Sequence, residues 1–180
     1  MFSVISRRAR AEIFHSSLRK MSSNRSKFLI PNAYINGEWV STDDKFEVRN
    51  PATGEVIGHT SSCGEKETNA AIDAAKEAFK TWSFTTAKSR SNLIRKLYEL
   101  QMKYRQELAE VITIEMGKPV SEAMGEINYG ASFFEWFSEE ARRINGEILQ
   151  SPFTDKMIMY TKEPIGPVGI IVPVSSRSSY

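Results

Sequence analysis

Between residues 64 and 146 the apolar positions recur at spacings of three and four, which is the period of a helix with one buried face. The first helix is expected to open at Gly64–Glu67, where two acidic residues occupy the turn that the helix dipole favours for negative charge. Its predicted buried stripe is Ala71, Ala75, Phe79 and Trp82.

A second and a third helix are predicted from residue 85 to residue 116. Thr85 or Thr86 is the candidate N-cap of the second, whose stripe is Leu93, Leu97, Leu100 and Tyr104. The pattern resumes after a polar break at residues 105–107 with Leu108, Val111, Ile112 and Met116. Gly117 followed by Pro119 is a typical helix stop.

The stretch Glu115–Gly146 is the most apolar part of the chain and predicts a long helix from an N-cap at Ser121 to Gly146. One face of this helix holds Ile127, Ala131, Phe134, Phe137, Ala141 and Ile144, and a second holds Tyr129, Phe133 and Trp136. A helix with two apolar faces is expected to be buried on more than one side, between layers or between subunits.

Before residue 64 the pattern favours two hairpins. Asn36-Gly37 supplies the two positive φ values of a type I′ turn within Tyr34–Val40. A strand from Phe46 to Arg49 then meets a turn at Asn50-Pro51-Ala52-Thr53-Gly54, and the chain returns as a strand from Glu55 to His59.

After Gly146 the period changes to two, and a strand is expected at about Lys156–Lys162. The continuous apolar run Val168–Val172 is typical of a buried parallel strand, which needs neighbouring strands and a crossover helix. Residues 174–180 are rich in serine and are interpreted as an aberrant tail. The fold class is therefore α/β, with hairpins, helices and the start of a Rossmann-like sheet, and incomplete.

The charge distribution singles out residues 1–27. They carry seven Lys/Arg and only one acid, Glu12, so that 17 basic and 21 acidic residues remain in the rest of the chain. Arginine, serine and interspersed apolar residues are typical of a mitochondrial presequence, and a disordered basic tail is the alternative. Met21 is a second possible start, which would give a cytosolic form. A basic segment confined to one end does not predict a nucleic-acid-binding face. The sequence contains no run of 18 or more apolar residues, so it predicts no membrane span.

Isolated reactive side chains do not make a site by themselves. Cys63 is the only cysteine, which fits a reducing compartment, and we interpret it as a loop residue rather than a nucleophile. His15 and His59 have no metal-ligand partner at short spacing. Arg142 and Arg143 suggest either contact with a carboxylate or the polar face of a buried helix, and the second is favoured.

Six runs of residues together resemble a known family. They are Tyr34-Ile-Asn-Gly-Glu-Trp39, Asn50-Pro-Ala-Thr-Gly54, Glu115-Met-Gly-Lys-Pro119, Glu122-Ala-Met-Gly-Glu126, Glu135-Trp-Phe-Ser-Glu-Glu-Ala-Arg-Arg143 and Glu163-Pro-Ile-Gly-Pro-Val-Gly169. In order and spacing they resemble the N-terminal part of an aldehyde dehydrogenase, over residues 32 to 173. The fifth run is most similar to the succinate-semialdehyde dehydrogenase branch.

The resemblance implies a dehydrogenase that uses NAD or NADP, a cysteine nucleophile and a glutamate base. Residues 28–173 would supply part of the cofactor-binding domain and, at 156–162, the first strand of an oligomerisation arm. Ile171, Val172 and Pro173 match positions that lie against the nicotinamide in relatives. The family's Pro-Trp-Asn-Phe-Pro run is replaced here by Pro173-Val174-Ser175-Ser176-Arg177, and no match to the nucleophile or base follows.

The resemblance also implies a structural Na⁺ or K⁺ site. Relatives hold such an ion with an acidic side chain, here Glu115, and with backbone carbonyls ahead of the Asn-Pro turn, here Val48 and Arg49. The alternative is an ion pair between Glu115 and Lys118.

We therefore expect a truncated form of an NAD(P)-dependent dehydrogenase that oxidises succinate semialdehyde to succinate, inactive and binding no cofactor by itself. Its expected partners are copies of itself or full-length aldehyde dehydrogenase subunits, with neither nucleic acid nor membrane. The alternative is a non-catalytic interaction module that pairs with full-length subunits through an arm strand with an unpaired edge.

Overall fold

The computed structural model describes residues 28–171, which form an α/β arrangement of three small sheets and four helices. The strands are β1 (Ala33–Ile35), β2 (Glu38–Val40), β3 (Lys45–Arg49), β4 (Val56–Ser61), β5 (Glu147–Leu149) and β6 (Ile158–Tyr160). The helices are α2 (Glu65–Trp82), α3 (Ala87–Lys103), α4 (Arg105–Met116) and α5 (Val120–Glu140). The predicted presequence, the serine-rich tail, Val172 and Pro173 lie outside the described residues.

Both predicted N-terminal hairpins are confirmed. β1 and β2 pair antiparallel around Asn36 and Gly37, whose φ values of 51° and 85° are those of the predicted turn. β3 and β4 also pair antiparallel, with an irregularity between Val48 and Arg49 where one extra residue of β4 interrupts the register.

The helix boundaries follow from local capping. The amide N–H of Gly64 donates to the Glu67 carboxylate at the start of α2, and the Thr86 hydroxyl accepts from the Ser89 N–H at the start of α3. α4 ends at Gly117, whose φ of 74° is left-handed, as the sequence predicts.

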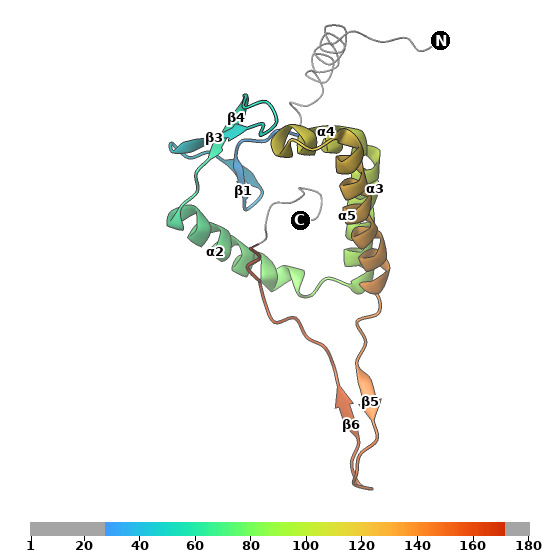
Figure 1. Cartoon of the computed structure of the whole chain (residues 1–180). Helices are drawn as coiled ribbons and strands as arrows, with labels where there is room; N and C mark the ends of the chain where they lie inside the picture. Colours follow the sequence, from blue (N-terminus) through green and yellow to red (C-terminus); the bar gives the residue numbers. More distant parts are fainter. Residues whose placement is uncertain (1–27, 172–180) are drawn as a thin grey trace, which may run out of the picture.

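The hydrophobic core is small and lies where α5 packs against α3 and α4 (Figure 1). Its buried apolar residues are Ala109, Val111, Ile112, Ile114, Ala123, Ile127 and Ala131. All seven belong to α4 and α5. In the described part of the chain, no helix is long and apolar enough to cross a membrane.

The prediction of a buried stripe on α2 is wrong. No residue of α2 is buried, and Ala71, Ala75 and Trp82 are exposed, while Phe79 is half-buried. The physical reason is that α2 lies across the molecule from α3 and α5, and its main contact among the described elements is with β1 (Figure 1).

The prediction that the aromatic helix is buried on several sides is also wrong for the described residues. Ile127 and Ala131 on the first face are buried, but Tyr129, Phe133 and Trp136 on the second are 66%, 45% and 64% exposed. The helix has neighbours on one side only. It also ends at Glu140, before the predicted Gly146, because the chain leaves the helix through a turn at residues 141–142.

The C-terminal segments differ from expectation in two ways. Residues 168–171 form no strand, and Val168, Ile170 and Ile171 are exposed, because no described strand lies beside them. The expected strand at 156–162 is present as β6, and β5, which the sequence did not predict, pairs antiparallel with one of its edges and leaves the other edge unpaired among the described residues. This hairpin projects from the helical body (Figure 1).

Candidate functional site

The candidate site lies where the turn between β3 and β4 meets the end of α4. Within the turn, the Asn50 side-chain oxygen accepts from the Ala52 N–H at 2.9 Å, and the Asn50 carbonyl accepts from the Gly54 N–H at 2.8 Å. Gly54 has a φ of 76°, which glycine adopts without strain. The Asn-Pro-x-x-Gly sequence therefore closes this turn through its own hydrogen bonds.

The turn is held against α4 through Gly117. A Cβ atom on Gly117 would lie 3.0 Å from Pro51 Cγ and 3.2 Å from the Ala52 N atom, so the two backbones approach as closely as glycine allows. Glu115 stands two residues before this contact, on the last turn of α4. The contact thereby fixes Glu115 beside the β3–β4 hairpin.

A cavity of about 240 Å³ lies between the hairpin and Glu115. Two of the three predicted ion ligands, Val48 and Glu115, line this cavity, and the third, Arg49, does not. The remaining lining residues are Leu29, Ile30, Pro31, Ile57, Gly58, His59 and Thr60. The structure thus brings together residues that are 67 positions apart in the sequence.

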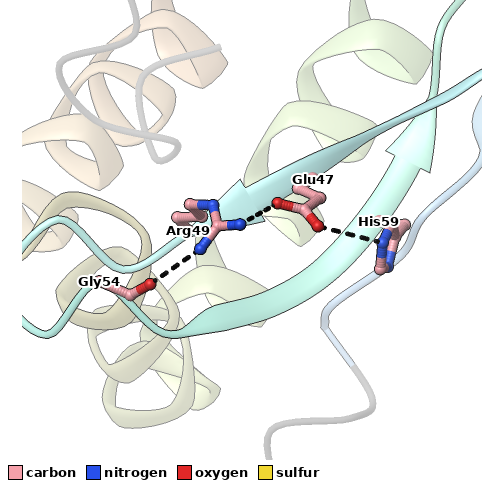
Figure 2. Close-up of polar contacts among 4 residues, drawn as sticks. All are labelled: Glu47, Arg49, Gly54 and His59. Atoms are coloured by element: carbon pink, nitrogen blue, oxygen red, sulfur yellow. Dashed lines mark hydrogen bonds and ion pairs between the residues drawn. The ribbon is translucent and has the colours of Figure 1, made fainter.

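The Arg49 side chain makes its polar contacts within the β3–β4 hairpin and does not line the cavity (Figure 2). Its Nη1 donates to the Gly54 carbonyl at 3.1 Å and its Nη2 pairs with the Glu47 carboxylate, whose other oxygen lies 4.0 Å from His59 Nε2. These side chains are about half exposed, so the pairs add little to stability. Arg49 could contribute only its backbone carbonyl to an ion.

The donor chemistry at this cavity fits a monovalent hard cation better than a transition metal. Among residues 28–171 no group of three or more His, Cys, Asp or Glu side chains is placed to hold a metal ion. Glu115 can supply a carboxylate, and the register of β3 and β4 is irregular between Val48 and Arg49, whose carbonyls are the other predicted ligands. Lys118, the alternative partner for Glu115, forms an ion pair with Glu126 of α5.

The other candidate residues do not converge on this cavity. Ile171 is fully exposed at the end of the described chain, and Cys63 is exposed in the loop before α2. His59 lines the cavity but belongs to β4, opposite Glu47 in the register.

Sequence reasoning missed the residues that form the outer wall of the cavity. The Pro31 carbonyl accepts from the Ser61 N–H and from the Thr60 hydroxyl, each at 2.9 Å, and holds residues 29–31 along β4. The only sequence signal for this contact is the apolar run Phe28–Ile30 before the first hairpin.

Known proteins resemble this chain in sequence and in fold. The profile of the aldehyde dehydrogenase family matches residues 39–174. Mitochondrial succinate-semialdehyde dehydrogenase of Homo sapiens is 42% identical over 154 residues, which cover 86% of this chain and 29% of that protein.

Solved structures give the same result. The crystal structure of succinate-semialdehyde dehydrogenase from Burkholderia pseudomallei matches with a TM-score of 0.77 and 44% identity, covering 81% of this chain and 30% of that one. A betaine aldehyde dehydrogenase mutant from Staphylococcus aureus, in complex with NAD⁺, matches with a TM-score of 0.75 and 30% identity over 82% and 30% of the two chains.

The α/β fold of residues 28–171 is thus that of the N-terminal part of an aldehyde dehydrogenase. The chain belongs to the aldehyde dehydrogenase family. It spans about three tenths of the length of the curated relatives that it matches.

Proposed function

We propose that this chain is the N-terminal part of an NAD(P)-dependent dehydrogenase that oxidises succinate semialdehyde to succinate. The observation that carries the proposal is the identity of 42% with succinate-semialdehyde dehydrogenase over 86% of the chain. The relative in complex with NAD⁺ supports a nicotinamide cofactor, which would receive the hydride when bound.

In this proposal residues 28–173 contribute structure rather than reacting groups. The α3–α4–α5 packing and the β3–β4 hairpin form part of the cofactor-binding domain, and β5 and β6 form part of the arm. Ile171, Val172 and Pro173 would approach the nicotinamide once a neighbouring sheet covers the apolar run. Residues 1–180 alone are expected to catalyse no aldehyde oxidation, because the one thiol, Cys63, is exposed in the loop before α2.

A Na⁺ or K⁺ ion between Glu115 and the carbonyls of Val48 and Arg49 would have a structural role. It would join the end of α4 to the β3–β4 hairpin at the 240 Å³ cavity. No step of the reaction would involve it.

The proposed location is the mitochondrial matrix, with residues 1–27 as the presequence and translation from Met21 as a cytosolic route. The mitochondrial relative supports this location. Fusing residues 1–27 to a fluorescent protein tests it directly, and the fusion should enter mitochondria whereas a fusion beginning at Met21 should not.

The dehydrogenase proposal is tested by retrieving the natural protein from its source with an antibody against residues 28–171. The retrieved protein should reduce NAD⁺ or NADP⁺ with succinate semialdehyde, and residues 1–180 produced alone should not. Reduction by residues 1–180 alone would contradict the proposal, as would a retrieved protein without this activity.

The β5–β6 hairpin favours a second candidate, a non-catalytic module that joins full-length subunits. All six strand residues are exposed, and each strand has one edge without a neighbouring strand among the described residues. Such edges pair readily with strands of another chain. A tagged 180-residue chain should then co-purify with full-length aldehyde dehydrogenase; elution only as an aggregate would argue against this role.

A further inference from the structure

The junction between the first half of α3 and the end of α5 forms a polar depression away from the 240 Å³ cavity. Ser91, Asn92 and Arg95 of α3 line one side, and Ser138, Glu139, Arg142 and Arg143 line the other. Ser91 and Ser138 are 6% and 2% exposed, and the Ser138 hydroxyl donates to the Glu135 carbonyl, whereas the three arginines are exposed and form the rim.

Arg142 is held in place by neutral oxygens. Its Nε donates to Ser91 Oγ at 3.1 Å and its Nη2 lies 3.5 Å from Asn92 Oδ1. The other two arginines of the rim have carboxylate partners, Arg95 with Glu135 at 3.5 Å and Arg143 with Glu140 at 2.7 Å. Within residues 28–171, Arg142 forms no ion pair. Its guanidinium group is oriented by the uncharged side chains of Ser91 and Asn92.

The lining of the depression carries more positive than negative charge, with three arginines against the carboxylate of Glu139, although Glu135 and Glu140 pair with two of these arginines. α3 has no acidic residue in its first turn, and its residues from Ala87 to Lys96 include four basic side chains and no acid. An arginine that is oriented by fixed hydrogen bonds and not yet neutralised is the side chain best suited to bind a carboxylate with two parallel hydrogen bonds. The Ser91 hydroxyl lies beside Arg142 Nε and can donate its own hydrogen to a carboxylate bound by Arg142.

We propose that this depression binds a carboxylate group, with Arg142 as the main ligand and Ser91 and Asn92 as the residues that orient it. Two sources share this chemistry, a free dicarboxylate such as succinate and an acidic side chain of a protein segment. The proposal does not depend on the dehydrogenase activity. The single carboxylate within the depression that competes for Arg142 is Glu139.

The test uses the 180-residue chain and calorimetric titration at neutral pH, with sodium succinate as one probe and the peptide acetyl-Ala-Glu-Ala-amide as the other. Sodium chloride at matched ionic strength serves as the reference for screening. Both probes should bind above this reference. Succinate binding at least about tenfold tighter than the peptide identifies a free dicarboxylate as the ligand, and equal binding identifies an acidic side chain.

Four variants separate a binding role from a structural one. Arg142→Gln should weaken binding by about tenfold or more, because a charge-assisted hydrogen bond is lost, and Arg142→Lys should weaken it less. Lys76→Gln is the matched control and should change binding little, because it removes an exposed positive charge of α2 that does not line the depression. Glu139→Gln should strengthen binding by removing the competing carboxylate.

Circular dichroism of each variant establishes that α3 and α5 are intact. The proposal is overturned if neither probe binds above the chloride reference. Equal losses in Arg142→Gln and Lys76→Gln would also overturn it, and so would unchanged binding in both Glu139→Gln and Arg142→Lys.

Discussion

Pro51 lies against Gly117 so closely that a Cβ atom on residue 117 would stand 3.0 Å from Pro51 Cγ. This contact joins the turn after β3 to the end of α4, two segments far apart in the sequence. It sets the position of Glu115 and hence the shape of the candidate ion cavity. The first prediction concerns this contact.

Gly117→Ala should destabilise the chain by about 1–3 kcal/mol, because alanine is strained at a φ of 74° and its methyl group would crowd Pro51 and Ala52. Gly125→Ala is the matched control. Gly125 lies within α5, where an added Cβ atom would have no neighbour within 4 Å, so alanine there should stabilise the helix by up to about 1 kcal/mol. Urea unfolding measures both changes, and equal effects would show that the Pro51 contact has no role.

Glu67 gives a prediction on pH. The Gly64 N–H donates to its carboxylate and lowers the pKa of Glu67 below the ordinary value. A lowered folded pKa means that the stabilisation is present above the unfolded pKa and is lost as the pH falls through the folded pKa. Glu67→Gln should therefore be less stable than the wild type at pH 7, and the difference should disappear as the pH falls through the lowered pKa of Glu67.

Glu65→Gln is the control for this measurement, because Glu65 also lies in the first turn of α2 but makes no such hydrogen bond in the described structure. Its stability relative to wild type should vary less with pH. Thermal unfolding from pH 2 to pH 8 compares the three proteins. A Glu67→Gln difference that persists unchanged in acid would rule out the capping carboxylate as its cause.

The proposed ion site predicts a specific dependence on salt. K⁺ or Na⁺ should raise the melting temperature above that in choline chloride of equal ionic strength, because a ligand that binds only the folded state stabilises it. Glu115→Gln should abolish this difference, whereas Glu122→Gln, at an exposed position of α5, should retain it. If choline and potassium give the same melting temperature for the wild type, no such ion binds.

The β5–β6 hairpin depends on Gly146. A Cβ atom there would overlap the carbonyl oxygen of Tyr160, so Gly146→Ala should separate β6 from the start of β5. Gly169→Ala, where nothing lies within 4 Å, is the control. Hydrogen exchange of the Glu147–Leu149 amides should become faster only in Gly146→Ala, with the α4 and α5 amides unchanged. Unchanged exchange at residues 147–149 would mean that the hairpin tolerates the side chain.

Local signals in the sequence were sufficient for the two N-terminal hairpins and for the ends of α2, α3 and α4, but not for α5, which begins at Val120 rather than after Ser121 and ends at Glu140 rather than at Gly146. Asn36-Gly37, Thr86 and Gly117 each determine their element through backbone geometry or a hydrogen bond within a few residues. The β5–β6 pairing was not predicted, because Glu147–Leu149 is short and eight residues separate it from its partner strand.

Burial was harder to predict than secondary structure. Trp82, Trp136 and Ile170 have the periodicity of buried residues but are 48%, 64% and 75% exposed. A periodic pattern indicates which face of an element a residue occupies. It does not show whether another element packs on that face. For the site, the Glu115–Val48 proximity was anticipated only through the family resemblance, because their contact depends on how the turn at Pro51 packs on Gly117.

The most direct test of the dehydrogenase proposal is a chimera. Residues 31–171 of this chain replace the aligned N-terminal part of the human mitochondrial succinate-semialdehyde dehydrogenase, which supplies the remaining length. If the chain has the proposed role, the chimera will oxidise succinate semialdehyde with reduction of NAD⁺, measured by absorbance at the NADH band. A chimera that folds and assembles like the human enzyme but reduces no NAD⁺ would contradict the proposal.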